Sequence, residues 1–484
     1  FAYGIYLCNI YYSNDYFNSV LYLKDVANTN LNNGRFVHYF IYSFFDRINF
    51  NILDCQVLTK PVLTLSVALG TTWLLASFTK IYRRNDMLHV CILDISLLLI
   101  FISPSFLSGW YLFPETCIGA SISMMCTFIA IHFWCHEQLT WKNIILSLIF
   151  ICLSVSMYQV YVELYVGICL TFSLLKYNFK FEKNSLKEVG LNLFCGGFAC
   201  IINIVIMSFL QKLEVIPRVT RSATLSFDVI VSNIQKILMT QKNIWYNMSG
   251  YMPRYVFAVF ILGLLIFIIF NLQKSGKQLF KPADYFYFIV NLCIVYVLAF
   301  APNIISDDIY IVPRTYLGVF SFLFIIINYA LYICTQITKS FFLYKPFLVY
   351  HTIALLITIL YVHDIQADTL VSNRFDEYEI KTLARIMDSY EADTGVKIDS
   401  IVYTWDENRR YGYDNVKWYD YNIRGMAIPW CFPAMVKYWI NPDIHIVEMT
   451  AEEYQSYFNG ESWTHFNPTE QTKIIDSTLY LVIY

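Results

Sequence analysis

The stretch YYSNDYFNS, Tyr11 to Ser19, places Asn14 and Asp15 directly after the first apolar run of a chain that is poor in charge. The same loop continues with NTNLNNGRFVHYFIYSFF, in which Gly34 and Arg35 precede an aromatic stretch able to lie along a membrane interface. A carboxylate can accept a proton and a guanidinium group can bind an anion. Asp15 is therefore either a helix end that faces water or an acid held with a base near one membrane surface.

Composition places these residues in a membrane protein. Of 484 residues, 57% are hydrophobic and 14% are charged, whereas ordinary soluble domains are roughly 25% charged. Apolar runs close to the ~20 residues that cross a bilayer recur along the chain. We predict eleven membrane spans, at residues 1–12, 61–79, 88–103, 117–134, 144–157, 158–175, 189–210, 255–272, 285–302, 315–335 and 347–362.

The first predicted span is too short to cross the hydrocarbon core as a helix. Because the chain also begins at Phe1, we expect the sequence to start partway through a first helix. A cleaved signal peptide is the alternative, but it would leave a more polar mature end than FAYGIYLCNIYY.

Basic loops predict the orientation. KIYRRND, KYNFKFEKNSLKE, QKSGKQLFK and TKSFFLYK occupy alternate loops, and the positive-inside rule places them in the cytoplasm. The other set is then outside, including the loop 13–60 and everything after His363.

The segment 364–484 changes character, with 20 acidic and 10 basic residues and no apolar run long enough to span a membrane. We predict a helix at 375–393 that ends before Gly395, and a short helix after the capping-box pair Thr450 and Glu453. SIVYTW, IHIVEM and TLYLVIY are predicted as strands at 400–405, 444–449 and 478–484.

The expected fold class is thus an α-helical polytopic membrane protein of about eleven transmembrane helices with a small C-terminal extracytoplasmic α/β domain. Residues 1–363 would form the transmembrane domain, with its catalytic loop at 13–60, and residues 364–484 the second domain.

Several kinds of site are not indicated. The sequence has no Cys/His cluster with metal-ligand spacing, no GxGxxG, no P-loop and no DxD pair, which disfavours a nucleotide-driven enzyme and a structural metal. The acidic balance argues against nucleic acid. Of thirteen cysteines, Cys55 and Cys431 are plainly on the predicted outside, where a bridge between them is one of the alternatives.

Four stretches together resemble a known family. YYSNDYFNS, NNGRFVHYF, SMYQVYVELY (156–165) and VPRTYL (312–317) are similar to the phage-borne, serotype-converting O-antigen glucosyltransferases, integral membrane enzymes related to the GT-C glycosyltransferases. The resemblance extends over nearly the whole chain, including a C-terminal periplasmic tail. Many relatives have two adjacent acids in the first outside loop, whereas this chain has Asn14 before Asp15.

The resemblance implies an enzyme of the bacterial inner membrane whose active site faces the periplasm. We predict no cofactor and no metal-ligating residues. Because the periplasm lacks nucleotide sugars, the donor would be undecaprenyl-phosphate-glucose, and the acceptor a lipid-linked O-antigen polysaccharide. Asp15 would act as general base and the reaction would invert the anomeric centre. Arg35, Arg254 and Arg314 would bind the donor phosphate; the alternative is that they anchor helix ends at the lipid headgroups.

Further polar residues would contact acceptor or sugar hydroxyls. Gln159 and Glu163 lie within a 32-residue apolar stretch, near its predicted outside tip. Polar groups at such depth usually face a cavity or a partner, so plain hydrogen bonding between helices is an equal alternative. Glu115, after Pro114, and Asn14 are weaker candidates.

The segment 403–421 mixes aromatic and charged residues. Trp405 and Trp418 could carry the apolar faces of sugar rings while polar neighbours bind hydroxyls. The alternative is that Trp405, Trp418 and Trp430 build the core of the C-terminal domain or dock it on the membrane.

Two other function classes stay open at this stage. An O-antigen or capsule polymerase also has many spans and a large outside loop, and a polysaccharide flippase or transporter would perform no chemistry. The early acid and the folded tail favour the transferase over the polymerase. A transporter would be expected to show paired, interrupted helices related by repeats, which the sequence does not indicate.

Overall fold

The structure is a computed structural model that describes residues 2–82, 86–136, 138–217, 226–274, 279–307, 309–337, 344–414, 416–417 and 422–484. The chain forms two compact units. We call the first the helical unit (Phe1–Tyr3, Lys24–Tyr111 and Thr116–His363) and the second the C-terminal unit (Gly4–Leu23, Leu112–Glu115 and Asp364–Tyr484).

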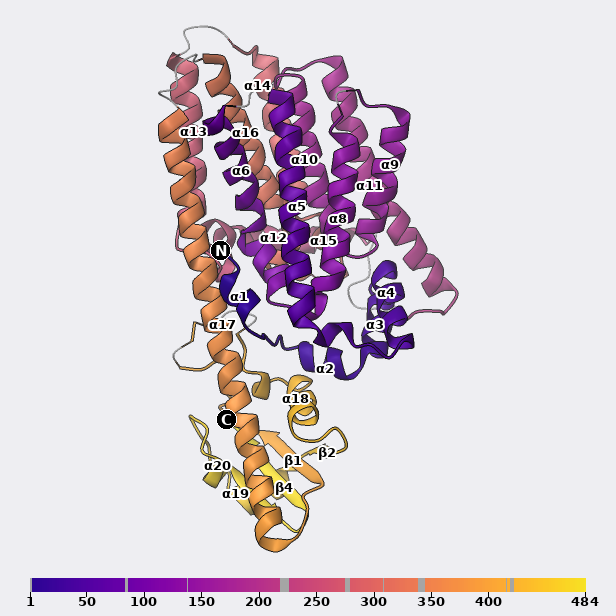
Figure 1. Cartoon of the computed structure of the whole chain (residues 1–484), viewed down its shortest axis with the longest axis vertical. Helices are drawn as coiled ribbons and strands as arrows, with labels where there is room; N and C mark the ends of the chain where they lie inside the picture. The colour runs from indigo at the N-terminus through magenta and orange to yellow at the C-terminus, as the bar shows by residue number, and fades with distance from the viewer. Residues whose placement is uncertain are drawn as a thin grey trace. The chain divides into compact units, whose positions relative to one another are not determined.

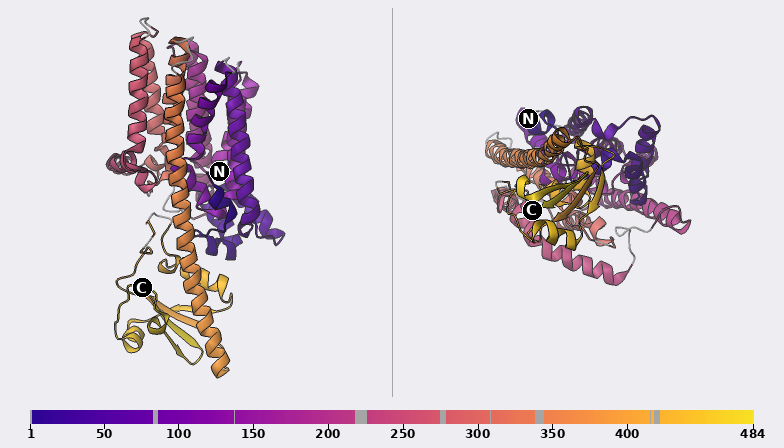
Figure 2. Two further views of the ribbon diagram at one scale, coloured as in Figure 1. Left: turned by 60° about the vertical axis from the view of Figure 1, so that its left-hand side comes forward. Right: turned by 90° about the horizontal axis from the view of Figure 1, so that it is seen from below.

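Long helices pack side by side in the helical unit (Figures 1 and 2). α8 packs against α5 and α9, and α10 packs against α11 and α16. The helical elements from α3 to α17 are α3 (Leu23–Asn32), α4 (Phe36–Arg47), η1 (Ile52–Asp54), α5 (Gln56–Tyr82), α6 (Met87–Phe101), α7 (Pro104–Phe106), η2 (Leu107–Tyr111), η3 (Pro114–Thr116), α8 (Cys117–Trp134), α9 (Trp141–Val155), α10 (Tyr161–Lys176), α11 (Lys183–Lys212), α12 (Phe227–Asn247), η4 (Met248–Gly250), α13 (Val256–Lys274), α14 (Pro282–Leu298), α15 (Ala301–Ile304), η5 (Pro313–Thr315), α16 (Gly318–Ile337) and α17 (Tyr344–Thr394).

Seven helices in the described part of the chain are long and apolar enough to cross a membrane. They contain α5, α6, α8, α11, α13, α16 and α17. The mostly helical fold with candidate membrane spans is therefore confirmed, whereas length and composition identify seven candidate spans and not the eleven predicted. The other predicted spans after the first fall on α9, α10 and α14, which are shorter helices.

The first predicted span, 1–12, is not a continuous helix, so that prediction was wrong. α1 (Gly4–Cys8) has five residues, and no regular secondary structure follows until α2 (Tyr16–Leu21). The Tyr6 N–H donates to Gln366 Oε1 and the Tyr12 N–H donates to Asn373 Oδ1, both at 2.9 Å. These side chains of α17 accept hydrogen bonds from N–H groups that the short helix leaves without an intrahelical partner.

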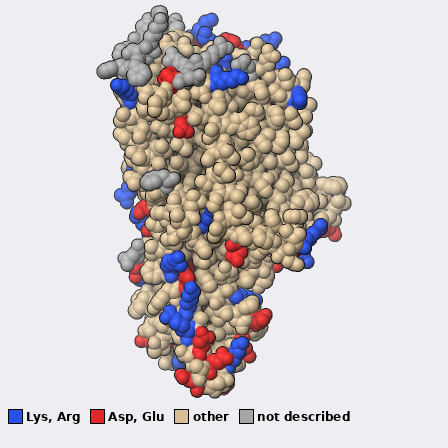
Figure 3. All heavy atoms as spheres, viewed as in Figure 1, with Lys and Arg blue, Asp and Glu red and all other residues tan. Residues whose placement is uncertain are grey.

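Charge is unevenly distributed on the face drawn in Figure 3. A broad band over the long helices is almost free of charged side chains, whereas Lys, Arg, Asp and Glu gather over the C-terminal unit. An uncharged band is what a lipid-facing surface requires, because a charge in hydrocarbon is costly.

The C-terminal unit contains a four-stranded sheet of order β2-β1-β4-β3. β1 runs parallel to β2 and β4, and β3 is antiparallel to β4. Its elements after α17 are β1 (Ser400–Trp405), η6 (Gly425–Ala427), α18 (Cys431–Trp439), β2 (His445–Glu448), α19 (Ala451–Phe458), α20 (Pro468–Gln471), β3 (Thr472–Ile475) and β4 (Thr478–Ile483). A hydrophobic cluster that includes Phe458, Trp463 and Val482 packs against this sheet.

Most of the local predictions for this segment are confirmed. The three predicted strands are β1, β2 and β4, and Thr450 and Glu453 form a capping box at the start of α19. Gly395 follows α17 with a φ of +71°, a conformation that glycine adopts readily. β3 was not predicted, and the helix predicted at 375–393 is the end of the 51-residue α17. Cys55 and Cys431, whose bridging the sequence left open, are both free thiols.

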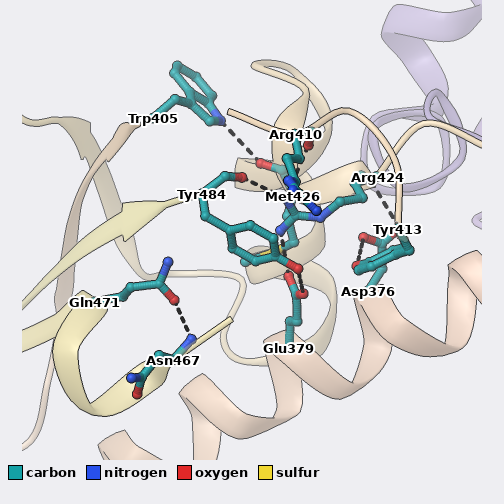
Figure 4. A network of polar contacts seen from close by, with 11 residues as sticks. Asp376, Glu379, Trp405, Arg410, Tyr413, Arg424, Met426, Asn467, Gln471 and Tyr484 are labelled. Carbon is teal, nitrogen blue, oxygen red and sulfur yellow. Dashed lines mark hydrogen bonds and ion pairs between the residues drawn. The ribbon is translucent and has the colours of Figure 1, made fainter. Parts of the chain in front are cut away.

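A buried arginine organises the polar core of the C-terminal unit (Figure 4). The Arg424 guanidinium is fully buried and donates to Glu379 Oε2 at 2.9 Å. It also donates to the carbonyls of Tyr484 and Arg410, at 2.6 and 3.1 Å, and lies 3.7 Å from the centroid of the Tyr484 ring. One side chain thus joins α17, the loop before η6 and the end of β4.

Asp376 extends this network (Figure 4). Its carboxylate accepts hydrogen bonds from the Tyr413 hydroxyl and the Gly425 N–H, both at 2.9 Å, and the Tyr484 hydroxyl donates to Glu379 at the same distance. Burial raises the pKa of Asp376 to about 7, against the lowering effect of the Gly425 hydrogen bond. Burial also raises the pKa of Glu379. Both carboxyls lie beyond the apolar part of α17.

The raised pKa of Asp376 predicts a pH dependence of stability. Since the folded state holds this proton up to about pH 7 and the unfolded state releases it near 3.8, the stabilisation is complete below about pH 4. It is lost as the pH rises through 7. The unfolding temperature of the purified protein in nanodiscs should fall between pH 5 and 8, by about 2–4 °C per kcal/mol lost.

Asp376→Asn should flatten this slope, because the amide does not titrate. Asp388→Asn, at an exposed position of the same helix, is the matched control and should keep the wild-type slope. Equal slopes in the wild type and the Asp376→Asn protein would contradict the assignment.

Candidate active site

Asp15 lies at the start of α2 in the C-terminal unit, where α2 packs against α18. Trp430, the residue before α18, donates its indole N–H to Asp15 Oδ1 at 3.0 Å. Asp15 is exposed and Trp430 is 54% exposed. One carboxylate oxygen is therefore held in place while the group remains accessible to a substrate.

Ser13 connects Asp15 to a second acid. The Asp15 N–H donates to Ser13 Oγ at 3.2 Å, and the Ser13 hydroxyl donates to the buried Glu115 at 2.6 Å. Asn14 lines a small pocket with Ser13 and Asp376. Among the residues suggested by the sequence, Asp15, Asn14 and Glu115 are thus brought together.

Arg35 is positioned in the helical unit by a turn after α3. Gly34 has a φ of +73°, and its carbonyl accepts a hydrogen bond from the Asn203 amide at 2.9 Å. The Gln159 side-chain amide donates to the carbonyl of Asn33, the residue before Gly34, at 3.2 Å. The Arg35 guanidinium then lies 4.9 Å from the centroid of the Tyr158 ring. Gln159 therefore supports the loop that holds Arg35.

His38 fixes α4 behind Arg35. A Cβ atom at Gly119 would lie 1.8 Å from His38 Nε2, so the imidazole packs where only glycine leaves room. Burial, and then the positive charge of Arg35, lower the pKa of His38 to about 3. The imidazole is therefore neutral at physiological pH, and Arg35 carries the positive charge of this pair.

Three rings lie between the segments that carry Arg35 and Arg314. We call Trp110, Tyr158 and Tyr161 the aromatic cluster. Trp110 lies edge-on to Tyr158 at 4.8 Å and stacks on Tyr161 at 5.1 Å between ring centroids. The residue before Trp110 is a glycine, where a Cβ would lie 3.1 Å from Arg314 Cβ. The π-helical turn η2 thus passes close to Arg314 at this glycine, while the Arg314 guanidinium lies 5.3 Å from the centroid of the Tyr310 ring.

Glu163 holds the segment that follows Arg314. It is buried, and its Oε2 accepts the Gly318 N–H at 2.7 Å, while its Oε1 has no hydrogen-bond partner among the described residues. The Asn303 amide donates to the carbonyl and hydroxyl of Thr315, both at 3.1 Å. These contacts fix η5, the short turn that contains Arg314.

The remaining candidates lie elsewhere. Arg254 is exposed over the Tyr246 ring, and within the described ranges no hydrogen bond or ring contact joins it to the aromatic cluster. Trp405 is part of β1 and donates its indole N–H to the Met426 carbonyl at 3.2 Å. Trp418 lies outside the described residues.

Sequence reasoning missed Trp430 and Trp110. Trp430 was considered only as a core residue or a membrane-docking residue, yet it donates a hydrogen bond to Asp15. Its position after Pro429 and before a short helix was the available signal, since such positions tend to be at the surface. Trp110 lies in a turn between two apolar runs, where aromatic residues commonly mark the membrane interface.

The described residues contain no group of three or more His, Cys, Asp or Glu side chains arranged to hold a metal ion. The fold and the groups above define a polytopic membrane protein with an accessible carboxylate in one unit and two arginines beside an aromatic cluster in the other.

The family described as Glucosyl transferase GtrII matches residues 4–327, and the chain belongs to this family. The match includes Asp15 and the three candidate arginines, and it confirms the family resemblance of the sequence. Membership implies transfer of a glucosyl group. No curated protein and no solved structure matches the chain.

The close approach at Gly318 predicts a selective effect of a small substitution. A Cβ there would lie 2.9 Å from Ala299 Cα and 3.2 Å from Glu163 Cβ, so Gly318→Ala should displace the start of α16 from Glu163. We expect a loss of about 1–3 kcal/mol of stability, as for other overpacked sites. Thermal unfolding of the purified membrane protein measures it.

Gly190→Ala is the matched control, because a Cβ at Gly190 has no neighbour within 4 Å and the residue lies in α11. Replacing a helical glycine with alanine in open space should be neutral or stabilising by up to ~1 kcal/mol. Equal stability of the two variants would argue against the Glu163–Gly318 contact.

Proposed function

We propose that the protein is an inverting glucosyltransferase that moves glucose from undecaprenyl-phosphate-glucose to a lipid-linked O-antigen polysaccharide. The reaction takes place on the periplasmic side of the bacterial inner membrane, the side assigned to loop 13–60 and residues 364–484 by the basic loops. The observation that carries the proposal is a pair of arginines in a family of glucosyl transferases: Arg35 lies over a ring of the aromatic cluster, and Arg314 lies against the backbone next to Trp110.

Asp15 is assigned as the general base. One of its oxygens is occupied by the Trp430 N–H, so the other accepts the proton of the acceptor hydroxyl. The acceptor oxygen forms a bond to the anomeric carbon from the face opposite the phosphate, and the bond from that carbon to the phosphate oxygen breaks. The products are the glucosylated acceptor, with an inverted anomeric centre, and undecaprenyl phosphate.

Arg35 and Arg314 are assigned to the donor phosphate. Negative charge builds up on the leaving oxygen as the sugar becomes oxocarbenium-like, and two guanidinium groups stabilise it through charge-assisted hydrogen bonds. No general acid is needed, because a phosphodiester leaves readily once its charge is stabilised. Arg254 is assigned a peripheral role, because it is exposed.

Glu163 and Gln159 support the segments that carry Arg314 and Arg35. Glu163 Oε2 holds Gly318 and Gln159 holds the loop before Arg35, so we assign them to positioning the arginines. Glu163 Oε1 is assigned to accept a hydrogen bond from a hydroxyl of the sugar donor or of the acceptor polysaccharide. Asn14 and Glu115 are assigned to the acceptor side of the reaction, because they lie with Asp15 around Ser13.

The assignment of Asp15 predicts the effect of removing its carboxylate. Asp15→Asn keeps the size of the side chain and its hydrogen bond to Trp430 but cannot accept the proton. Glucosylation should fall by roughly 10²–10⁴-fold at equal membrane levels. Structural analysis of cell-surface polysaccharide, with and without the gene, measures it: a transferase adds one hexose per repeat, whereas a polymerase changes only chain length.

Asn14→Ala is the neighbouring control and should reduce activity far less. Trp430→Phe keeps the ring and removes only the N–H donor, so a loss smaller than that of Asp15→Asn is expected. Full polysaccharide modification by the Asp15→Asn protein would leave Asp15 as a solvated helix end.

A second prediction concerns Arg314. Arg314→Lys keeps the charge but removes the planar fork that matches two phosphate oxygens. We expect kcat/KM for the lipid-linked donor to fall by about tenfold to a hundredfold, as for loss of a hydrogen bond to a charged group. Purified enzyme with defined donor and acceptor measures it.

Arg35→Lys should behave like Arg314→Lys, whereas Arg254→Lys should lose less. Unchanged kinetics for Arg314→Lys in a protein that inserts normally would make Arg314 an interfacial anchor. A large loss for Arg254→Lys would add that residue to the phosphate site.

A further inference from the structure

The C-terminal unit contains a second pocket of about 310 Å³, which shares no lining residue with the small pocket beside Asn14. We call it the C-terminal pocket. α17 contributes Phe375, Tyr378 and Glu379, and the loop 410–414 and the segment 464–468 complete it. It is the larger of these two pockets, and its volume is at the low end of the ~300–1,000 Å³ of small-molecule sites.

Aromatic rings form much of its wall. Phe375 and Tyr378 lie on one face of α17 and are 42% and 57% exposed. The Phe375 ring lies 4.8 Å from that of Tyr413, and Phe466 lines the pocket from another segment. Ring faces gathered from three separate segments form a platform that an apolar ligand face can cover.

Polar side chains accompany these rings. Arg410 forms an ion pair with Asp414, and Thr464 and His465 also line the pocket. All four carry hydrogen-bonding groups within reach of solvent, because none of them is buried. A hydrocarbon ligand could not form hydrogen bonds with these groups, whereas a sugar combines hydroxyls with an apolar ring face.

The base of the pocket is held rigidly. Glu379 and Tyr484 line it, and both belong to the buried network around Arg424 (Figure 4). Their hydrogen bonds are already made inside the protein, so they shape the pocket and leave recognition to the rim. A preformed floor reduces the entropy lost on binding.

Charge indicates which sugars fit. The segment 364–484 has 20 acidic and 10 basic residues, so a polyanionic glycan would be repelled. Neutral hexoses carry no charge and are not repelled. The same network connects the two pockets. Asp376 lines the small pocket with Asn14, and Glu379, one turn further along α17, lines the C-terminal pocket.

We propose that the C-terminal pocket binds a neutral hexose of the acceptor polysaccharide, at a repeat other than the one that receives glucose. The proposal rests on the proposed function, since it names part of the acceptor that Asp15 would act on. Binding here keeps a long acceptor on the protein and raises its local concentration near Asp15. Polymeric acceptors then have a lower KM than a single repeat.

Direct binding tests the proposal without any donor. The full-length protein in nanodiscs is titrated calorimetrically with the strain's own O-polysaccharide, released from its lipid. Wild type and Asp15→Asn should bind equally and saturably. Phe375→Ala/Tyr378→Ala should bind about tenfold more weakly or worse, because it removes two ring faces. Tyr390→Ala, on the same helix but outside the pocket, is the matched control and should bind as wild type.

Kinetics provide a second measurement. The double variant should raise KM for the polymeric acceptor to that for a single repeat, with kcat at saturation within about twofold of wild type. If the double variant does not fold, Tyr378→Ala alone serves, because that ring is largely exposed. Wild-type binding and polymer KM in the pocket variants would overturn this inference while leaving the transferase intact. Loss of activity in Asp15→Asn with normal binding separates the two proposals.

Discussion

A fully buried guanidinium group, that of Arg424, joins the parts of the C-terminal unit. Its partners come from α17, from the loop before η6 and from the end of β4. Breaking a buried ion pair by removing one partner costs about 3–5 kcal/mol, since the other charge stays buried. The residue after Arg424 is bonded to Asp376, and the chain continues from there through η6 to Trp430. The ion pair thus holds the start of the segment that leads to Trp430, the hydrogen-bond partner of Asp15.

Local patterns predicted much of the fold. The strands β1, β2 and β4 and the capping box of α19 each depend on residues close in sequence. Long apolar runs likewise predicted helices, because a lipid-exposed backbone must satisfy its hydrogen bonds within the segment. The first span failed because its partners, Gln366 and Asn373, are distant in sequence. β3 was missed because a four-residue strand has little pattern of its own.

The candidate site could be predicted only in part. Residue types and the family resemblance selected Asp15, Arg35 and Arg314, since carboxylates and arginines in an apolar chain are few. Nothing in the sequence indicated that Trp110 would connect the surroundings of the two arginines, or that Trp430 would meet Asp15. Both contacts are set by tertiary packing, and indole rings in an aromatic-rich sequence do not reveal which are buried and which face a ligand.

The hydrogen bond between Asp15 and Trp430 spans 415 residues of chain. At the ~5–20 residues per second of protein synthesis, Trp430 leaves the ribosome on the order of 20–80 s after Asp15. Throughout that interval the helices of the intervening chain are already being inserted into the membrane. During this interval Asp15 lacks its hydrogen-bond partner. The Asp15–Trp430 hydrogen bond can form only after the intervening helices have been synthesised. Assembly order alone keeps the carboxylate from its final geometry until the rest of the protein is in place.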